Sequence, residues 1–252
     1  MFKPSHLHHS ACHDHCHTSI PDTFEMLCWN VHKNNQKDPG FQSFLHKEVE
    51  RRGIDLILFQ EACFRNNHHF ELADFSYDAA ANLEFRREFY GVLTAGRMES
   101  SYAKAYLSEG RESVLGPHKS LLLSNYLFKD GSTLLILNVH AINFRENQRY
   151  NKELERFLDL LKGHKGPMIL AGDFNSWNKQ RMDKLQKITE KLSLKVVNFK
   201  ETGKVKSFMG KELDFVFYRE LELIESEVMD EHQLSDHNPL FVRFKRNPIE
   251  TL

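Results

Sequence analysis

Residues 168–175 read Met-Ile-Leu-Ala-Gly-Asp-Phe-Asn, a short apolar run that ends in a carboxylate and an amide. An apolar run of this length before a glycine is typical of a strand that is buried on both faces. Asp173 and Asn175 therefore follow directly on a predicted core strand. Polar groups at the ends of core strands gather at one rim of a sheet, where active sites are usually built. This stretch predicts a sheet-based fold with functional groups at one rim.

Other stretches of the chain have the same arrangement, with polar residues where an apolar run begins or ends. Taken singly, each has a plainer explanation: a solvated loop, an Asx turn, or a core histidine with satisfied hydrogen bonds. Those explanations account poorly for acids, amides and histidines at so many strand ends in one chain. The residues are Asn30 after 24–29, Gln60 and Glu61 after 56–59, His140 and Asn143 after 135–139, Asp214 before 215–217, and Asp236 and His237 before 239–242.

This set of side chains favours one kind of chemistry. Carboxylate and amide oxygens suit a single hard cation, and histidines supply groups that move protons. The chain shows neither a nucleophilic serine elbow nor a Cys–His pair. The pattern therefore indicates attack by water on phosphorus rather than covalent catalysis by a side chain.

From residue 23 onward, strand-like and helix-like patterns alternate, which predicts one α/β domain. Phe41, Leu45 and Val49 recur at helical spacing, and Gly53 is placed to end that helix. Two further helices are expected around 154–161 and over 178–192. Predicted strands cover residues 24–31, 54–59, 119–128, 133–140, 168–171, 194–199, 213–219 and 239–245. We expect a domain over 23–247, a disordered His/Cys-rich tail over 1–22, and a C-terminal tail over 248–252.

The composition limits the class of protein. Apolar residues make up 40% of the chain and aromatic ones 12%, enough to fill a core of this size. Lys and Arg number 34 against 35 Asp and Glu, so we expect no large basic footprint for nucleic acid. No apolar stretch approaches the length of a membrane span, and Met1 leads into a polar segment. We expect a cytoplasmic monomer without a disulfide framework.

The first 17 residues are unusual in their histidine and cysteine content. Such side chains are ligands for Zn²⁺ or Ni²⁺, and the spacing of the two cysteines suits a tetrahedral site. A low-complexity tail with only adventitious metal affinity is the plainer alternative. The residues are His6, His8, His9, Cys12, His13, His15, Cys16 and His17.

The motifs in this order resemble the endonuclease/exonuclease/phosphatase superfamily, whose members have the DNase I-like fold, and most closely its bacterial YafD-like branch. The resemblance implies a four-layer αββα sandwich, in which two mostly antiparallel or mixed sheets pack together with helices outside. It covers residues 24–245. The matching motifs are Trp29-Asn30-Val31, Phe59-Gln60-Glu61, Asn138-Val139-His140, Gly172-Asp173-Phe174-Asn175, Leu213-Asp214-Phe215 and Ser235-Asp236-His237.

The resemblance also implies roles for these positions. Glu61 would be the principal Mg²⁺ ligand, with Asn30 and Asp236 in the same metal shell, and Mn²⁺ is an alternative cation. Asp214 would orient His237, which activates water or steadies the phosphate. The remaining implied roles are Asp173 as the group that positions water or the leaving oxygen, His140 as proton donor, and Asn143 and Asn175 as donors to phosphate oxygens.

Two functions remain open from the sequence. The first is a Mg²⁺-dependent hydrolase that cleaves a phosphodiester or phosphomonoester. Its phosphoester substrate is nucleic acid, a nucleotide, or a phospholipid or inositol-phosphate head group. Lys119 and Arg111 are candidate phosphate contacts for this function. The second is a catalytically idle member of the fold that binds a partner, with the tail as a metal-binding contact.

Overall fold

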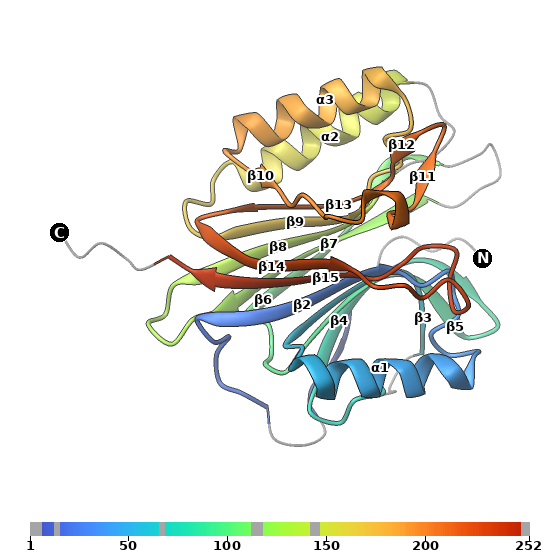
Figure 1. Ribbon diagram of the computed structural model, residues 1–252, viewed down its shortest axis with the longest axis vertical. Helices are drawn as coiled ribbons and strands as arrows, with labels where there is room; N and C mark the ends of the chain where they lie inside the picture. Colours follow the sequence, from blue (N-terminus) through green and yellow to red (C-terminus); the bar gives the residue numbers. More distant parts are fainter. Residues whose placement is uncertain (1–6, 13–15, 66–68, 112–117, 142–146, 248–252) are drawn as a thin grey trace.

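The computed structural model describes residues 7–12, 16–65, 69–111, 118–141 and 147–247. Two large mixed sheets pack face to face between two layers of helix, which confirms the predicted four-layer sandwich (Figure 1). The first sheet has the order β1 (Leu7–Ser10), β4 (Ser76–Phe85), β5 (Glu88–Gly96), β3 (Leu56–Phe64), β2 (Thr23–Asn30), β15 (Leu240–Arg246) and β14 (Leu221–Val228).

The second sheet lies against the inner face of the first. Its order is β10 (Lys195–Val196), β13 (Asp214–Arg219), β9 (Met168–Asp173), β8 (Thr133–His140), β7 (His118–Leu127) and β6 (Tyr102–Arg111). A separate hairpin of β11 (Ser207–Phe208) and β12 (Lys211–Glu212) precedes β13. A single 3-10 turn, η1 (Thr202–Lys204), comes before that hairpin.

The layers follow from strands that are apolar on both faces. Along β8, Leu134 and Ile136 face the core between the sheets, whereas Leu135 and Leu137 face the helices. Because side chains alternate across a strand, a continuous apolar run fills both cores at once. The helices α2 (Asn147–Leu161) and α3 (Lys179–Lys191) cover this outer face of the second sheet.

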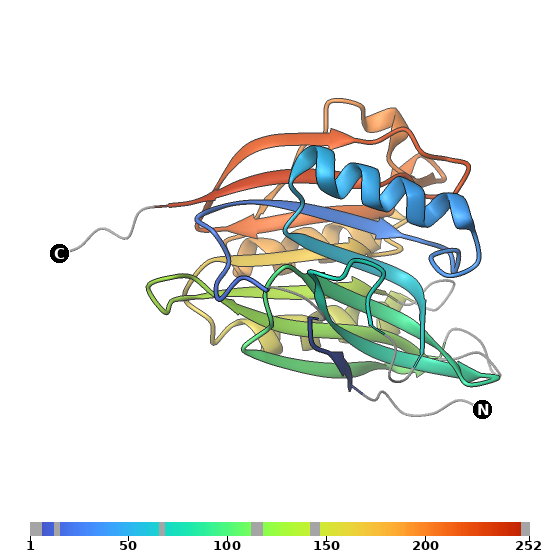
Figure 2. The ribbon, with the colours of Figure 1, turned by 90° about the horizontal axis from the view of Figure 1, so that it is seen from below.

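The helix α1 (Pro39–Arg52) covers the outer face of the first sheet (Figure 2). Asp38 caps its N-terminus by accepting a hydrogen bond from the Gly40 amide. Gly53 ends the helix as predicted, because its left-handed backbone (φ 67°) lets its amide donate to the Val49 carbonyl. The buried face of α1 consists of Phe41, Leu45, Glu48 and Val49.

Part of the segment expected to be a disordered tail forms the edge strand β1 of the first sheet. β1 pairs antiparallel with β4, and His9 Nδ1 lies 2.9 Å from a carboxylate oxygen of the buried Asp78. Cys12 and Cys16, which the sequence suggested as possible metal ligands in a chain without a disulfide framework, form a disulfide. In this form neither sulfur is a thiolate ligand, and metal binding by the segment stays a prediction.

None of the helices in the described ranges is long and apolar enough to cross a membrane.

Candidate active site

Strand direction brings the predicted polar residues of the second sheet to one edge. β8 and β9 run parallel, so their last residues, His140 and Asp173, lie side by side. β13 runs antiparallel to β9, so its first residue, Asp214, pairs with Asp173. Three polar groups from distant parts of the sequence therefore meet at a single rim.

The first sheet contributes residues from the parallel strands β2 and β3. Asn30 ends β2 in register with Gln60. At the next residue of β3 the pairing with β5 shifts register, and Glu61 adopts a left-handed backbone with φ 50°. A bulge of this kind re-aims a side chain. Glu61 is accordingly only partly buried and lines the pocket, whereas its neighbours in β3 stay in the core.

Buried amides join the two sheets beneath the site. Gln60 donates to Asn138 Oδ1 across the sheets at 2.8 Å. Asn138 in turn donates to the carbonyls of Phe59 and Leu93 in the first sheet, at 3.2 and 2.9 Å. Asn30 also spans the sheets, since its amide donates to Asp173 Oδ2 at 3.1 Å. These fully buried hydrogen bonds fix the two rims relative to one another.

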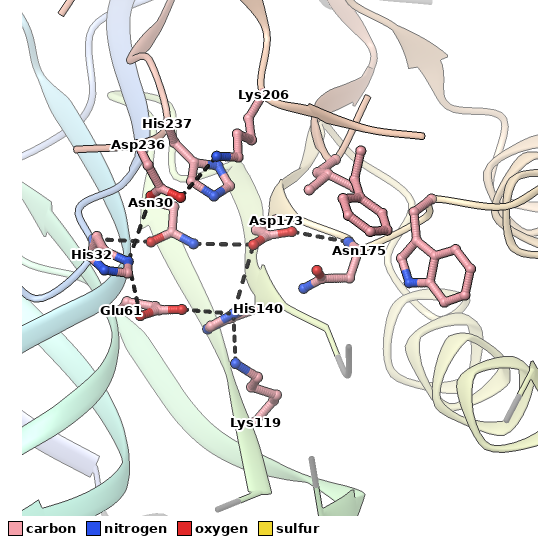
Figure 3. Close-up of a pocket in the computed structure, with 13 residues that line it drawn as sticks. Asn30, His32, Glu61, Lys119, His140, Asp173, Asn175, Lys206, Asp236 and His237 are labelled. Carbon is pink, nitrogen blue, oxygen red and sulfur yellow. Dashed lines mark hydrogen bonds and ion pairs between the residues drawn. The ribbon is translucent and has the colours of Figure 1, made fainter. Parts of the chain in front are cut away.

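The rims enclose a pocket of about 220 Å³ (Figure 3). Most of the residues predicted for the site line it, and four that the sequence did not single out do so as well. The predicted residues are Asn30, Glu61, Lys119, His140, Asp173, Asn175, Asp236 and His237, and the additional ones are His32, Trp177, Lys206 and Phe208. Leu213, which belongs to one of the motifs quoted above, completes the lining.

His237 is held by Asp214 and by the backbone around it. Its Nδ1 lies 2.7 Å from Asp214 Oδ2, and both side chains are buried. The indole of Trp29 donates to the His237 carbonyl at 2.7 Å. Burial disfavours the imidazolium, but the charge and hydrogen bond of Asp214 outweigh it and raise the pKa of His237 to about 9. At neutral pH His237 is therefore a cation.

On the opposite wall, Glu61 lies beside His140 and Lys33. His140 Nε2 is 3.6 Å from Glu61 Oε1, and Lys33 Nζ is 3.4 Å from Glu61 Oε2. Burial alone raises the pKa of a carboxyl group, but His140, Lys119 and Lys33 outweigh it and lower the pKa of Glu61 to about 2. Glu61 is therefore ionised at neutral pH.

Lys119 and His140 form a pair at the base of this wall. Lys119 is buried, and its Nζ lies 3.0 Å from His140 Nε2. Burial, followed by the charge of Lys119, holds the pKa of His140 well below its usual value. An ammonium group that donates to Nε2 fits a neutral imidazole with its proton on Nδ1.

Asp173 occupies the centre of the pocket (Figure 3). Burial, together with the nearby charge of Asp214, raises its pKa to about 7. It accepts hydrogen bonds from the Asn30 amide group and from the Asn175 backbone amide, the latter at 3.0 Å. A central carboxyl group with this pKa exchanges its proton near neutral pH.

Asp236 lies at the rim rather than beside the buried carboxylates. Its side chain is 51% exposed, and its two oxygens face Lys206 Nζ at 2.9 Å and His32 Nδ1 at 3.6 Å. The tightest acid–histidine group in the described residues is instead Asp173, Asp214 and His237. Asn143 and the side chain of Arg111 lie outside what the structure describes.

Most of the additional pocket residues are brought to the pocket by tertiary contacts, and His32 is the exception. His32 lies two residues beyond Asn30, a proximity that the sequence could have flagged. Lys206 and Phe208 belong to the hairpin region before β13, where Phe208 meets Trp177 edge to face at 6.1 Å between ring centroids. Residues 204–212 have no helix-like or strand-like periodicity that would predict this contact.

Comparison with known proteins identifies the family. A family model described as the endonuclease/exonuclease/phosphatase family matches residues 27–237, most of the chain and all of the strand ends described above. The chain belongs to this family. Nucleases and phosphatases both cleave phosphoesters, so membership supports phosphoester hydrolysis as the general class of reaction.

Other members of the endonuclease/exonuclease/phosphatase family are similar over nearly their whole length. A UPF0294 protein of Yersinia enterocolitica is 43% identical over 235 residues, which cover 90% of this chain and 86% of that protein. A family member from Bacteroides thetaiotaomicron superposes with a TM-score of 0.69 at 15% identity, covering 90% of this chain and 98% of that one. A mannosyl-6-phosphatase of the same species has a TM-score of 0.65 at 16% identity, covering 88% and 99%.

Proposed function

We propose that the protein is a metal-dependent hydrolase that uses water to cleave a phosphoester, with Mg²⁺ as the cation. One observation carries this proposal. The Asp214–His237 pair, the ionised Glu61 and the Lys119–His140 pair surround one pocket with Asp173 between them. Such a pocket contains groups that can bind an anion, groups that can bind a cation and groups that can transfer a proton, all within one small volume.

The side chains present fit a hard cation. Glu61 carries a full charge in the pocket, and the Asn30 Oδ1 atom, which accepts from the His32 amide at 3.1 Å, lies close by. Asp214 Oδ1 is buried and accepts no hydrogen bond from the described residues. Oxygen donors of this kind are the usual ligands of Mg²⁺. Glu61 and Asn30 would hold this cation, which would neutralise the charge that develops on the phosphoryl oxygens.

The protein groups divide the remaining work. Asp173, with its pKa near 7, accepts a proton from the attacking water as the new P–O bond forms. His237, protonated at neutral pH, donates a hydrogen bond to a phosphoryl oxygen. The bond to the leaving oxygen breaks on the side of Lys119 and His140, and the Lys119 ammonium donates the proton that the leaving oxygen takes up.

The test is hydrolysis of a panel of phosphomonoesters and phosphodiesters with Mg²⁺, with Mn²⁺ and with EDTA. We expect Glu61→Gln and His237→Gln each to lower kcat/KM by about 10²–10⁴-fold. His232→Gln is the matched control, since His232 lies in the same loop but is exposed and pairs only with Asp230 in the described structure. Undiminished activity in EDTA, or in the Glu61→Gln, His237→Gln double variant, would refute the proposal.

A further inference from the structure

A second pocket of about 120 Å³ lies beside the first and shares three side chains with it, namely Glu61, Lys119 and His140. The two pockets are therefore separated only by these three side chains and not by packed residues of the hydrophobic core. The other residues that line the second pocket are Lys33, Asn82, Leu83, Tyr90 and Gly91.

The second pocket carries an excess of positive charge. Lys33 and Lys119 both line it, against the single carboxylate of Glu61. Lys37 adds a further cation near its wall, with Nζ 5.8 Å from the centre of the Tyr90 ring. Glu88, which accepts a hydrogen bond from the Tyr90 hydroxyl at 2.8 Å, pairs with Arg65 at 2.6 Å.

The backbone fixes Lys33 at the mouth of this pocket. Its amide donates to the Glu61 carbonyl at 2.9 Å, and its left-handed φ of 65° turns the chain there. Its side chain is 46% exposed, and its ammonium group lies 3.4 Å from Glu61 Oε2 on the wall that the two pockets share. Lys119 contributes from the buried side, within 3.0 Å of His140.

The size and walls of the pocket suit a compact anion. Its volume of about 120 Å³ gives room for one phosphate group. Gly91 leaves backbone on one wall, because a Cβ there would lie 1.9 Å from the Ala80 carbonyl oxygen. A larger residue at this position would displace β4.

We propose that this second pocket is a subsite for another phosphate group of the substrate, next to the phosphate that is cleaved. The proposal rests on the proposed function and narrows it to phosphoesters that carry two neighbouring phosphates. Lys33 and Lys119 bind the second phosphate, and Lys119 lies between the two. Such a phosphate comes either from a nucleotide chain or from a small polyol bisphosphate, and both present the same chemistry.

The experiment compares kcat/KM on paired probes that differ by one phosphate. One pair is the dinucleotide dTpdT with and without a terminal phosphate, tested at either end. The other pair is an inositol monophosphate and an inositol bisphosphate. We expect the added phosphate to raise kcat/KM by about tenfold in at least one pair, the effect of one charge-assisted hydrogen bond.

In Lys33→Glu we expect this gain to fall to about twofold or less. Lys33→Gln, which removes the charge without reversing it, should lose the gain as well and serves as the test if Lys33→Glu does not fold. Lys162→Glu is the control for net charge, since Lys162 is exposed and pairs with Asp159 outside both pockets. A gain confined to one pair identifies the source of the phosphate. Hydrolysis without any gain, or a gain unchanged in both Lys33 variants, overturns the subsite alone. Absence of hydrolysis of every probe overturns the proposed function as well.

Discussion

Removal of His237 changes how stability depends on pH, and the structure sets the size of the effect. His237 donates to Asp214 at 2.7 Å, and its side chain is 8% exposed. Its pKa is raised from the ordinary value of 6.5 to about 9. A difference of this size corresponds to about 3 kcal/mol of extra stability for the protonated folded protein, at about 1.4 kcal/mol per pKa unit.

The sign of the effect follows from proton binding. Between pH 6.5 and 9 the folded protein retains a proton on His237 that the unfolded chain releases. Rising pH therefore favours unfolding in this window, by up to about 1.4 kcal/mol per pH unit. The contribution is complete below pH 6.5 and absent above pH 9.

The assay is urea unfolding at half-unit steps from pH 6 to pH 10, with EDTA present so that no cation competes with the proton. The difference in unfolding free energy between the natural protein and His237→Gln should shrink by about 3 kcal/mol across this range. The same difference for His232→Gln should stay flat, since that side chain is 75% exposed. A difference for His237→Gln that is constant with pH, or grows with pH, would refute the reasoning.

Two further predictions concern the strand ends. Gly172→Ala should lower the unfolding free energy by at least about 2 kcal/mol, because φ is 135° there and a Cβ would lie 2.0 Å from the Val139 carbonyl oxygen. Urea unfolding measures this loss. The control is Gly131→Ala, which has open space around it and should lower the unfolding free energy by about 1 kcal/mol or less. Lys119→Gln should raise the pKa of His140, seen by NMR titration of the ring, and lower kcat/KM by about 10²-fold; an unmoved His140 titration would contradict the assigned contact.

The sequence predicted the strands that are buried on both faces and the polar residues at their ends. β9 and β8 consist of continuous apolar runs, and such runs have few structural alternatives. Asp173 and His140 were identified because each interrupts such a run at its last residue. The order of the motifs then predicted the layers, since it matched the family.

Elements that depend on tertiary contacts were missed. β11 and β12 have two residues each, and most of these side chains are exposed, so no apolar alternation marks them. The edge strand β14 carries glutamates at several exposed positions and reads as a solvated loop. The predicted strand over 194–199 shrinks to Lys195–Val196, because only those two residues pair with β13.

The geometry of the site could not be predicted from the residue types alone. The role of Glu61 depends on a bulge in β3, which sequence patterns do not encode. The family resemblance implied that Asp236 belongs to the metal shell, and this stays a prediction; in the structure its side chain pairs with Lys206 and His32 at the rim of the pocket. Charge partners of this kind come from separate loops, and their proximity is a property of the folded chain.

The charge of the pocket explains how a chain of net charge -1 accommodates a phosphate. Glu61 and Asp214 oppose Lys119 and His237 at short range, so the buried charges are nearly balanced before any ligand binds. A phosphate that entered alone would face these carboxylates, and a cation that entered alone would face Lys119 and His237. Binding the two together keeps the pocket neutral, so each should raise the affinity of the other by the same factor. Under the proposed function, the cation would be part of the phosphate site itself, and a large basic surface would be unnecessary.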